Sequence, residues 1–153
     1  MGIHLPHLVL VVLATTLPIL AGCERELTWT EASRAVGLAD PTVDRLLLGL
    51  VNGDYETFAS NFDDFMRRSV PDTCFAEWRE DLDNELGAYQ SREVHRVAQA
   101  DEFYVVEYLA SFERTKSVTV GIAFHRKEPY SVDHLWIEAG QSSWAPEPRR
   151  QCK

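Results

Sequence analysis

Residues 102–126 read EFYVVEYLASFERTKSVTVGIAFHR, and this stretch decides the fold. Large apolar side chains recur at every second position over 104–112 and again over 118–124. A period of two is typical of β-strands that bury one face. Only a short polar segment around Arg114-Thr115 separates the two runs, so the two strands are expected to pair antiparallel.

The same pattern continues on both sides of this hairpin. The predicted strands are 89–98, 102–113, 116–126 and 131–139, with turns near 100–101, 114–115 and 127–129. Because the connections are short, the four strands are expected to form an antiparallel meander.

The chain before Ala88 has apolar side chains at helical spacing instead. A first helix is predicted from Asp40-Pro41 to Asn52-Gly53, because an acidic N-cap followed by proline is a helix start and glycine is a stop. A second helix is predicted from Asp54 to about Arg67-Arg68, and a third from Pro71-Asp72 to Gly87. Three N-terminal helices followed by four strands predict an α+β domain.

The N-terminal residues predict an export signal. An uncharged apolar run over 8–19 is too short to span a membrane comfortably and is typical of a signal-peptide core. It ends in Leu20-Ala21-Gly22-Cys23, which resembles the lipobox of prokaryotic lipoproteins. The resemblance implies peptidase recognition of Leu20, Ala21 and Gly22, and lipidation of Cys23. The alternative is an ordinary signal peptide with a chance cysteine.

These signals divide the chain into four parts. We expect a signal peptide over 1–22, a tether over 23–39, one domain over 40–140 and a tail over 141–153. The expected location is the extracytoplasmic side of the cell envelope, with the lipid on Cys23 as the membrane anchor. The choice between inner and outer membrane stays open.

Charge limits the possible partners, and the cysteine content allows one disulfide. The formal net charge is −9, with 24 acidic and 15 basic residues. Binding to nucleic acid draws on Lys and Arg, so we expect no nucleic-acid partner. Cys74 and Cys152 are either a disulfide pair or two unrelated thiols.

Several short motifs resemble one protein family. Gly53-Asp54-Tyr55, the segments 86–89 and 108–112, and Val118-Thr119-Val120 are similar to domain-of-unknown-function family 3887, in the nuclear-transport-factor-2-like superfamily. The resemblance covers roughly residues 41–139. It implies a strongly curved sheet that wraps the helices as a cone with an open pocket, and it transfers no catalytic residue.

Metal and cofactor sites are not expected. An acidic alternation over 81–85 resembles the start of a calcium loop, but Leu86 stands where such a loop requires glycine. His95, His125 and His134 are widely spaced and match no zinc-binding pattern. No nucleophile elbow, phosphate loop or dinucleotide fingerprint occurs.

The implied cone suggests one group of pocket residues. Ketosteroid isomerase shares the superfamily fold and pairs a carboxylate with a phenol in an apolar pocket. Glu107, Asp133 or His134 beside a tyrosine would be a comparable arrangement. The plainer interpretation is that the acids are exposed strand residues and the tyrosines belong to the core. The possible pocket residues are Tyr89, Tyr104, Glu107, Tyr108 and His134.

The sequence therefore predicts an envelope lipoprotein whose noncatalytic domain binds a small molecule, a peptide or an envelope protein. A small cavity enzyme of isomerase, dehydratase or hydrolase type is one alternative. A structural factor in envelope assembly is the other. No cofactor is implied, and catalytic residues are unknown.

Overall fold

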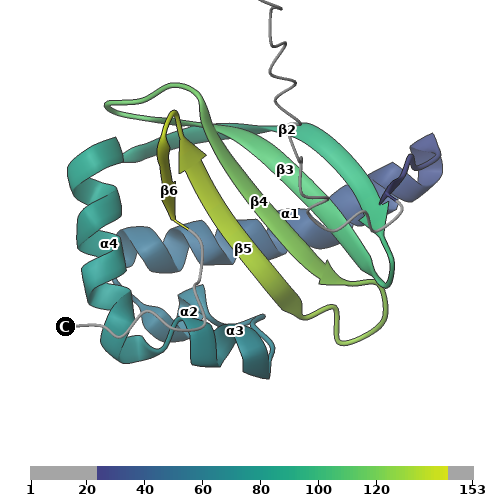
Figure 1. The fold of residues 1–153 in the computed structure, drawn as a ribbon, viewed down its shortest axis with the longest axis horizontal. Coiled ribbons are helices and arrows are strands. Elements are labelled where there is room, and N and C mark those ends of the chain that lie inside the picture. Colours follow the sequence, from purple (N-terminus) through teal and green to yellow (C-terminus); the bar gives the residue numbers. More distant parts are fainter. Residues whose placement is uncertain (1–23, 145–153) are drawn as a thin grey trace, which may run out of the picture.

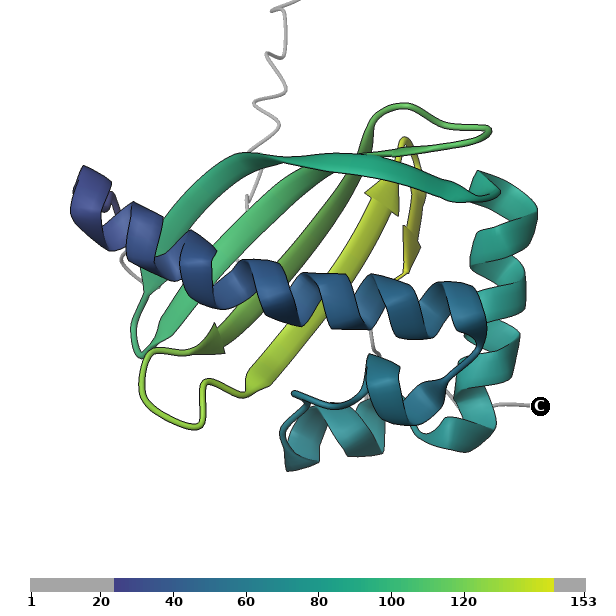
Figure 2. The same ribbon diagram turned by 180° about the vertical axis from the view of Figure 1, so that it is seen from behind.

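An antiparallel sheet with helices against one face forms this domain in a computed structural model that describes residues 24–144 (Figures 1 and 2). The α+β class expected from the sequence is thereby confirmed. The elements are β1 (Glu24–Arg25), α1 (Trp29–Asn52), α2 (Tyr55–Phe58), α3 (Asp64–Ser69), α4 (Asp72–Leu86), β2 (Tyr89–Ala100), β3 (Phe103–Phe112), β4 (Val118–His125), β5 (Val132–Ala139) and β6 (Ser142–Trp144).

The sheet keeps the order of the chain from β1 to β6, and every neighbouring pair is antiparallel. Strands β2 to β5 correspond to the four predicted strands. In β3 buried and half-buried residues alternate, which is the expected signature of a strand with one core face. Helix α1 crosses one face of the sheet (Figure 2), and its buried residues belong to the same core cluster as those of β3 and β4.

The first helix is longer than predicted. It begins at Trp29, inside the segment expected to be a tether, and runs through Asp40-Pro41 without ending. A capping box explains the earlier start, because the Thr28 side chain accepts from the Glu31 N–H while the Glu31 carboxylate accepts from the Thr28 N–H. Ala35 and Ala39 are fully buried, so the apolar stripe starts before the proline.

Four helices replace the three that were predicted. The predicted second helix is divided into α2 and α3, and the residues between them lie against β5. Asp54 caps α2 and Asp63 caps α3, each through a side-chain oxygen that accepts a backbone N–H. A second N-cap inside one apolar repeat explains the division.

Two short strands lie outside the predicted sheet. β1 pairs with the end of β2, and β6 pairs with β5 in the range expected to be a tail. Trp144 of β6 is only 5% exposed and belongs to the core, which explains why this segment is ordered against the sheet. The finer expectation of a cone that encloses a pocket stays a prediction. Within residues 24–144, no helix is long and apolar enough to cross a membrane.

Candidate functional site

Two carboxylates and an imidazole meet where the link between α2 and α3 lies against the start of β5. The Asp63 N–H donates to the Val132 carbonyl at 3.0 Å, and the Val132 N–H donates to the Asn61 carbonyl at 2.8 Å. These two backbone hydrogen bonds fix the link beside the strand. Asp63 therefore lies next to a residue of β5 that is distant in the sequence.

The three side chains are Asp63, His125 and Asp133, which we call the acid–imidazole cluster. One ligand atom from each lies within 4.8 Å of the other two, and all three residues are half-buried. His125 Nε2 is 3.9 Å from Asp63 Oδ2. Asp63 Oδ1 accepts the Met66 N–H at 2.7 Å as the N-cap of α3, so only its second oxygen faces the imidazole.

Asp133 occupies an irregular point in the sheet. The register between β4 and β5 shifts between Ala123 and Phe124, which allows Asp133 to face the cluster. The His134 Nδ1 atom lies 2.5 Å from the Asp133 Oδ2 atom. Burial, followed by the facing carboxyl group of Asp63, raises the pKa of Asp133 above its usual value.

The two carboxyl groups of the acid–imidazole cluster have no lysine or arginine ion-pair partner among residues 24–144. Within this range, the ion-pair partner of Asp63 is the imidazole of His125, and that of Asp133 is the imidazole of His134. Two carboxyl groups that face each other in a partly desolvated place repel when both are ionised. A cation would relieve this repulsion.

A cavity of about 530 Å³ opens beside the same cluster. It shares His125 with the cluster and is lined by the β2–β3 turn and the β4–β5 hairpin. The lining residues are Asp101, Glu102, His125, Arg126, Lys127, Glu128, Pro129 and Ser131. The cluster is therefore accessible from solvent on the side of His125.

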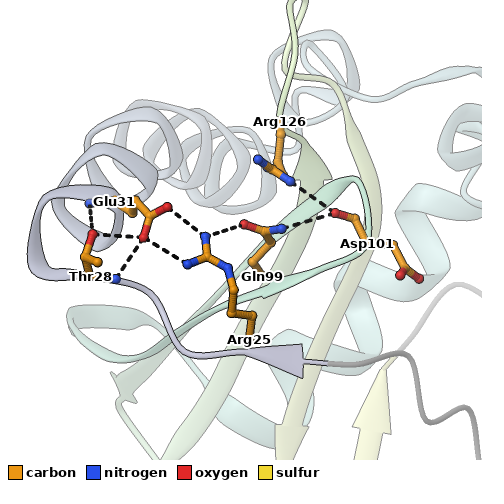
Figure 3. Close-up of polar contacts among 6 residues, drawn as sticks. All are labelled: Arg25, Thr28, Glu31, Gln99, Asp101 and Arg126. Carbon is orange, nitrogen blue, oxygen red and sulfur yellow. Dashed lines mark hydrogen bonds and ion pairs between the residues drawn. The ribbon is translucent and has the colours of Figure 1, made fainter.

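Polar contacts connect the rim of this cavity to the start of α1 (Figure 3). Arg126 Nη1 and Gln99 Nε2 both donate to the Asp101 carbonyl, at 3.3 and 3.5 Å. Gln99 Oε1 accepts from Arg25 Nη2 at 2.9 Å, and Arg25 pairs with Glu31 at 2.7 Å. The hydrogen bonds from Arg25 and then from Thr28 lower the pKa of Glu31 to about 2.

A second charged cluster, which we call the Arg92 cluster, joins α1 to β2 and β3. Arg92 reaches Asp44 Oδ1 at 2.6 Å and Asp40 Oδ1 at 3.2 Å. The Tyr108 hydroxyl donates to Asp40 Oδ1 at 2.9 Å, and the Arg92 guanidinium lies 5.0 Å from the centre of the Tyr108 ring. Burial and then the hydrogen bond with Asp40 raise the pKa of Tyr108.

The five possible pocket residues are not gathered in one pocket. Tyr104 and Tyr108 are buried in the core, whereas Glu107 lies on the other face of β3, 3.5 Å from Arg96. Tyr89 packs on Phe112 with the ring centres 5.6 Å apart. His134 is exposed beside Asp133, so it is the one member near the acid–imidazole cluster. A functional role for these residues stays a prediction.

The cysteine and lipobox residues are only partly described. Cys74 is disulfide-bonded, and its partner is outside residues 24–144. The pairing with Cys152 therefore stays a prediction. Leu20, Ala21, Gly22 and Cys23 also lie outside the described residues.

Sequence reasoning named Asp133 only as a possible partner of a tyrosine, and it did not single out Asp63. Asp63 and Asp133 are far apart in the chain, and neither lies in a short ligand motif with His125. The only local signal was the N-cap chemistry of Asp63, which the prediction of one long helix had hidden. The expectation of no metal site came from spacing alone and stays a prediction, because spacing does not detect side chains that only the fold brings together.

Comparison with known proteins gives one match. Residues 10–55 match the IclR helix-turn-helix domain family, over less than a third of the chain. Neither curated proteins nor solved structures give a match.

This match contradicts several expectations from the sequence. Helix-turn-helix domains bind DNA, so the match corrects the resemblance to family 3887, the envelope lipoprotein function with both its alternatives, the envelope location, and the partners expected. Lipid anchoring and the exclusion of nucleic acid are thus both contradicted. The physical reason is that an apolar run as short as 8–19 also fits a buried helix of a soluble domain.

The structure describes residues 24–55 of the matched range. They comprise β1, the whole of α1 and the start of α2. Residues 29–52 form one uninterrupted helix. Residues 10–23 of the match lie outside the described part of the chain.

Proposed function

We propose that this protein is a DNA-binding regulator of transcription and that its N-terminal segment, including α1, contacts the DNA. The observation that carries this proposal is the match of residues 10–55 to the IclR helix-turn-helix domain. In helix-turn-helix proteins, the N-terminal residues of one helix contact base edges in the major groove.

The position of α1 supports this proposal. Its first turns extend past the strands in both views of the domain (Figures 1 and 2). Trp29 is 86% exposed, and Ser33, Arg34 and Gly37 are exposed on the following turns. A projecting helix end with an exposed arginine is sterically available to a groove about 12 Å wide.

The charges near the start of α1 are also compatible with a phosphate backbone. Glu31 is paired with Arg25, and Asp40 is paired with Arg92. Pairing reduces the repulsion that these carboxylates exert on phosphate. The net charge of −9 opposes binding elsewhere on the chain, so we expect modest affinity that weakens steeply with salt.

Fluorescence anisotropy of a labelled duplex with the full chain tests the proposal. We expect binding at low salt whose affinity falls linearly with the logarithm of salt concentration. Arg34→Ala should weaken binding several-fold and reduce the salt slope by about one. Arg68→Ala, at an exposed arginine of α3, is the matched control and should leave binding unchanged. Absence of salt-dependent binding, or equal effects of the two substitutions, would contradict the proposal.

A further inference from the structure

We propose that Asp63, His125 and Asp133 bind one divalent transition-metal ion that accepts mixed nitrogen and oxygen ligands, such as Zn²⁺ or Co²⁺. This inference is independent of DNA binding. It rests on the contacts that bring these three side chains together from the α2–α3 link and from the ends of β4 and β5.

Charge is the first argument. Two carboxylates and an imidazole offer up to two negative charges and one neutral donor to the same small volume. Within residues 24–144, no lysine or arginine is paired with either carboxylate. A divalent cation balances the two carboxylates, which a single protein cation does not.

Geometry is the second argument. The candidate ligand atoms lie within 4.8 Å of one another, and His125 Nε2 is already 3.9 Å from Asp63 Oδ2. Zinc binds imidazole nitrogen and carboxylate oxygen at about 2.0–2.2 Å, so ligand atoms around one ion are roughly 3–3.5 Å apart. The contraction needed, up to roughly 1–2 Å between ligand atoms, is within reach of side-chain rotation.

Two of the ligands are already oriented by contacts outside the cluster. The Met66 N–H holds Asp63 Oδ1, and His134 Nδ1 lies at Asp133 Oδ2. Partners of this kind orient the ligands of metal sites and tune their affinity. Asp63 thus has two roles, because one oxygen caps α3 while the other faces the ion.

The donor set selects the class of metal. Ca²⁺ takes six to eight oxygen ligands and Mg²⁺ prefers octahedral oxygen, whereas imidazole suits Zn²⁺, Fe²⁺, Co²⁺ and Ni²⁺. One imidazole and two carboxylates leave at least one coordination position for water. The cavity beside His125 gives solvent access to that position.

Co²⁺ titration of the full chain, without an affinity tag, tests the inference. We expect one equivalent of Co²⁺ to produce visible ligand-field absorption, and Zn²⁺ to displace it. His125→Gln and Asp133→Asn should each weaken Co²⁺ binding at least tenfold. His95→Gln and Asp64→Asn change an exposed histidine and an exposed carboxylate outside the cluster, and they should bind Co²⁺ as the wild type does.

Asp63→Asn separates loss of a ligand from loss of the fold. Asparagine is as good an N-cap as aspartate, so α3 should remain capped while Co²⁺ binding weakens. Circular dichroism of each variant checks that it is folded. The inference is overturned if the folded wild type binds no Co²⁺, if the cluster variants bind it as well as the controls, or if only Mg²⁺ or Ca²⁺ binds.

Discussion

The Arg92 cluster and the acid–imidazole cluster contain similar groups in different balance. In the first, one guanidinium contacts Asp40 and Asp44, and the Tyr108 hydroxyl occupies a further acceptor site. In the second, Asp63 and Asp133 face each other, and among the described residues they form ion pairs only with imidazoles. Both clusters are partly buried, so burial does not explain the difference.

The difference distinguishes a structural cluster from a binding site. A cluster in which one guanidinium bridges two carboxylates ties elements together, here α1 to β2 and β3. Repulsion between facing carboxylates destabilises the unliganded protein, and a bound cation relieves that repulsion. The Arg92 cluster should therefore matter for stability, and the acid–imidazole cluster for ligand binding.

Removing the guanidinium from the Arg92 cluster should have the largest effect on the free energy of unfolding. The Arg92 side chain is 14% exposed, and Arg92→Met would leave the carboxylate of Asp40 without its cation. Asp40 and Asp44 keep access to water, which lowers the cost. We expect a loss of about 2 kcal/mol in the free energy of unfolding, measured by urea denaturation. Arg34→Met, at an exposed arginine of α1, should change it by less than about 0.5 kcal/mol.

Neutralising one acid of the acid–imidazole cluster should instead raise the free energy of unfolding of the metal-free protein. Asp133→Asn removes the repulsion from Asp63 in metal-free protein. We expect the free energy of unfolding to rise by a few tenths to about 1 kcal/mol in the presence of a chelator. A large decrease in the same denaturation experiment would show that this cluster, like the Arg92 cluster, holds the fold together.

The smallest effect concerns a surface pair in neither cluster. The pKa of Glu31 is lowered to about 2 by Arg25 and Thr28. A lowered pKa in the folded state means that the carboxylate stabilises the fold above its unfolded-state pKa, near 4.5, and that this contribution is lost as the pH falls toward 2. We expect NMR titration of the Glu31 carboxyl to show this shift, and Arg25→Ala to move the pKa back toward 4.5.

The strands could be predicted from the sequence because their signal is local. Alternation over 104–112 and 118–124 gave β3 and β4 and their antiparallel pairing. The helix boundaries were harder, since Asp40-Pro41 has the chemistry of a helix start but lies inside α1. There, the capping box at Thr28 and the buried Ala35 outweigh the proline.

The acid–imidazole cluster could not be predicted, because its members meet through tertiary contacts. Backbone hydrogen bonds with Val132 hold Asp63 beside β5. Asp133 faces Asp63 because of a register shift between β4 and β5. Neither feature has a signature in the sequence around His125. The burial of Trp144 could not be predicted for the same reason, since it depends on the pairing of β6 with β5.

Thermal unfolding with and without Zn²⁺, for the wild type and for Asp63→Asn, tests most directly whether the acid–imidazole cluster is a cation site. A ligand that binds only the native state stabilises it by about 2.7 kcal/mol at one hundred times its Kd. We therefore predict that Zn²⁺ raises the Tm of the wild type by clearly more than that of Asp63→Asn. An unchanged wild-type Tm, or an equal increase in both proteins, would contradict the contrast between the two clusters.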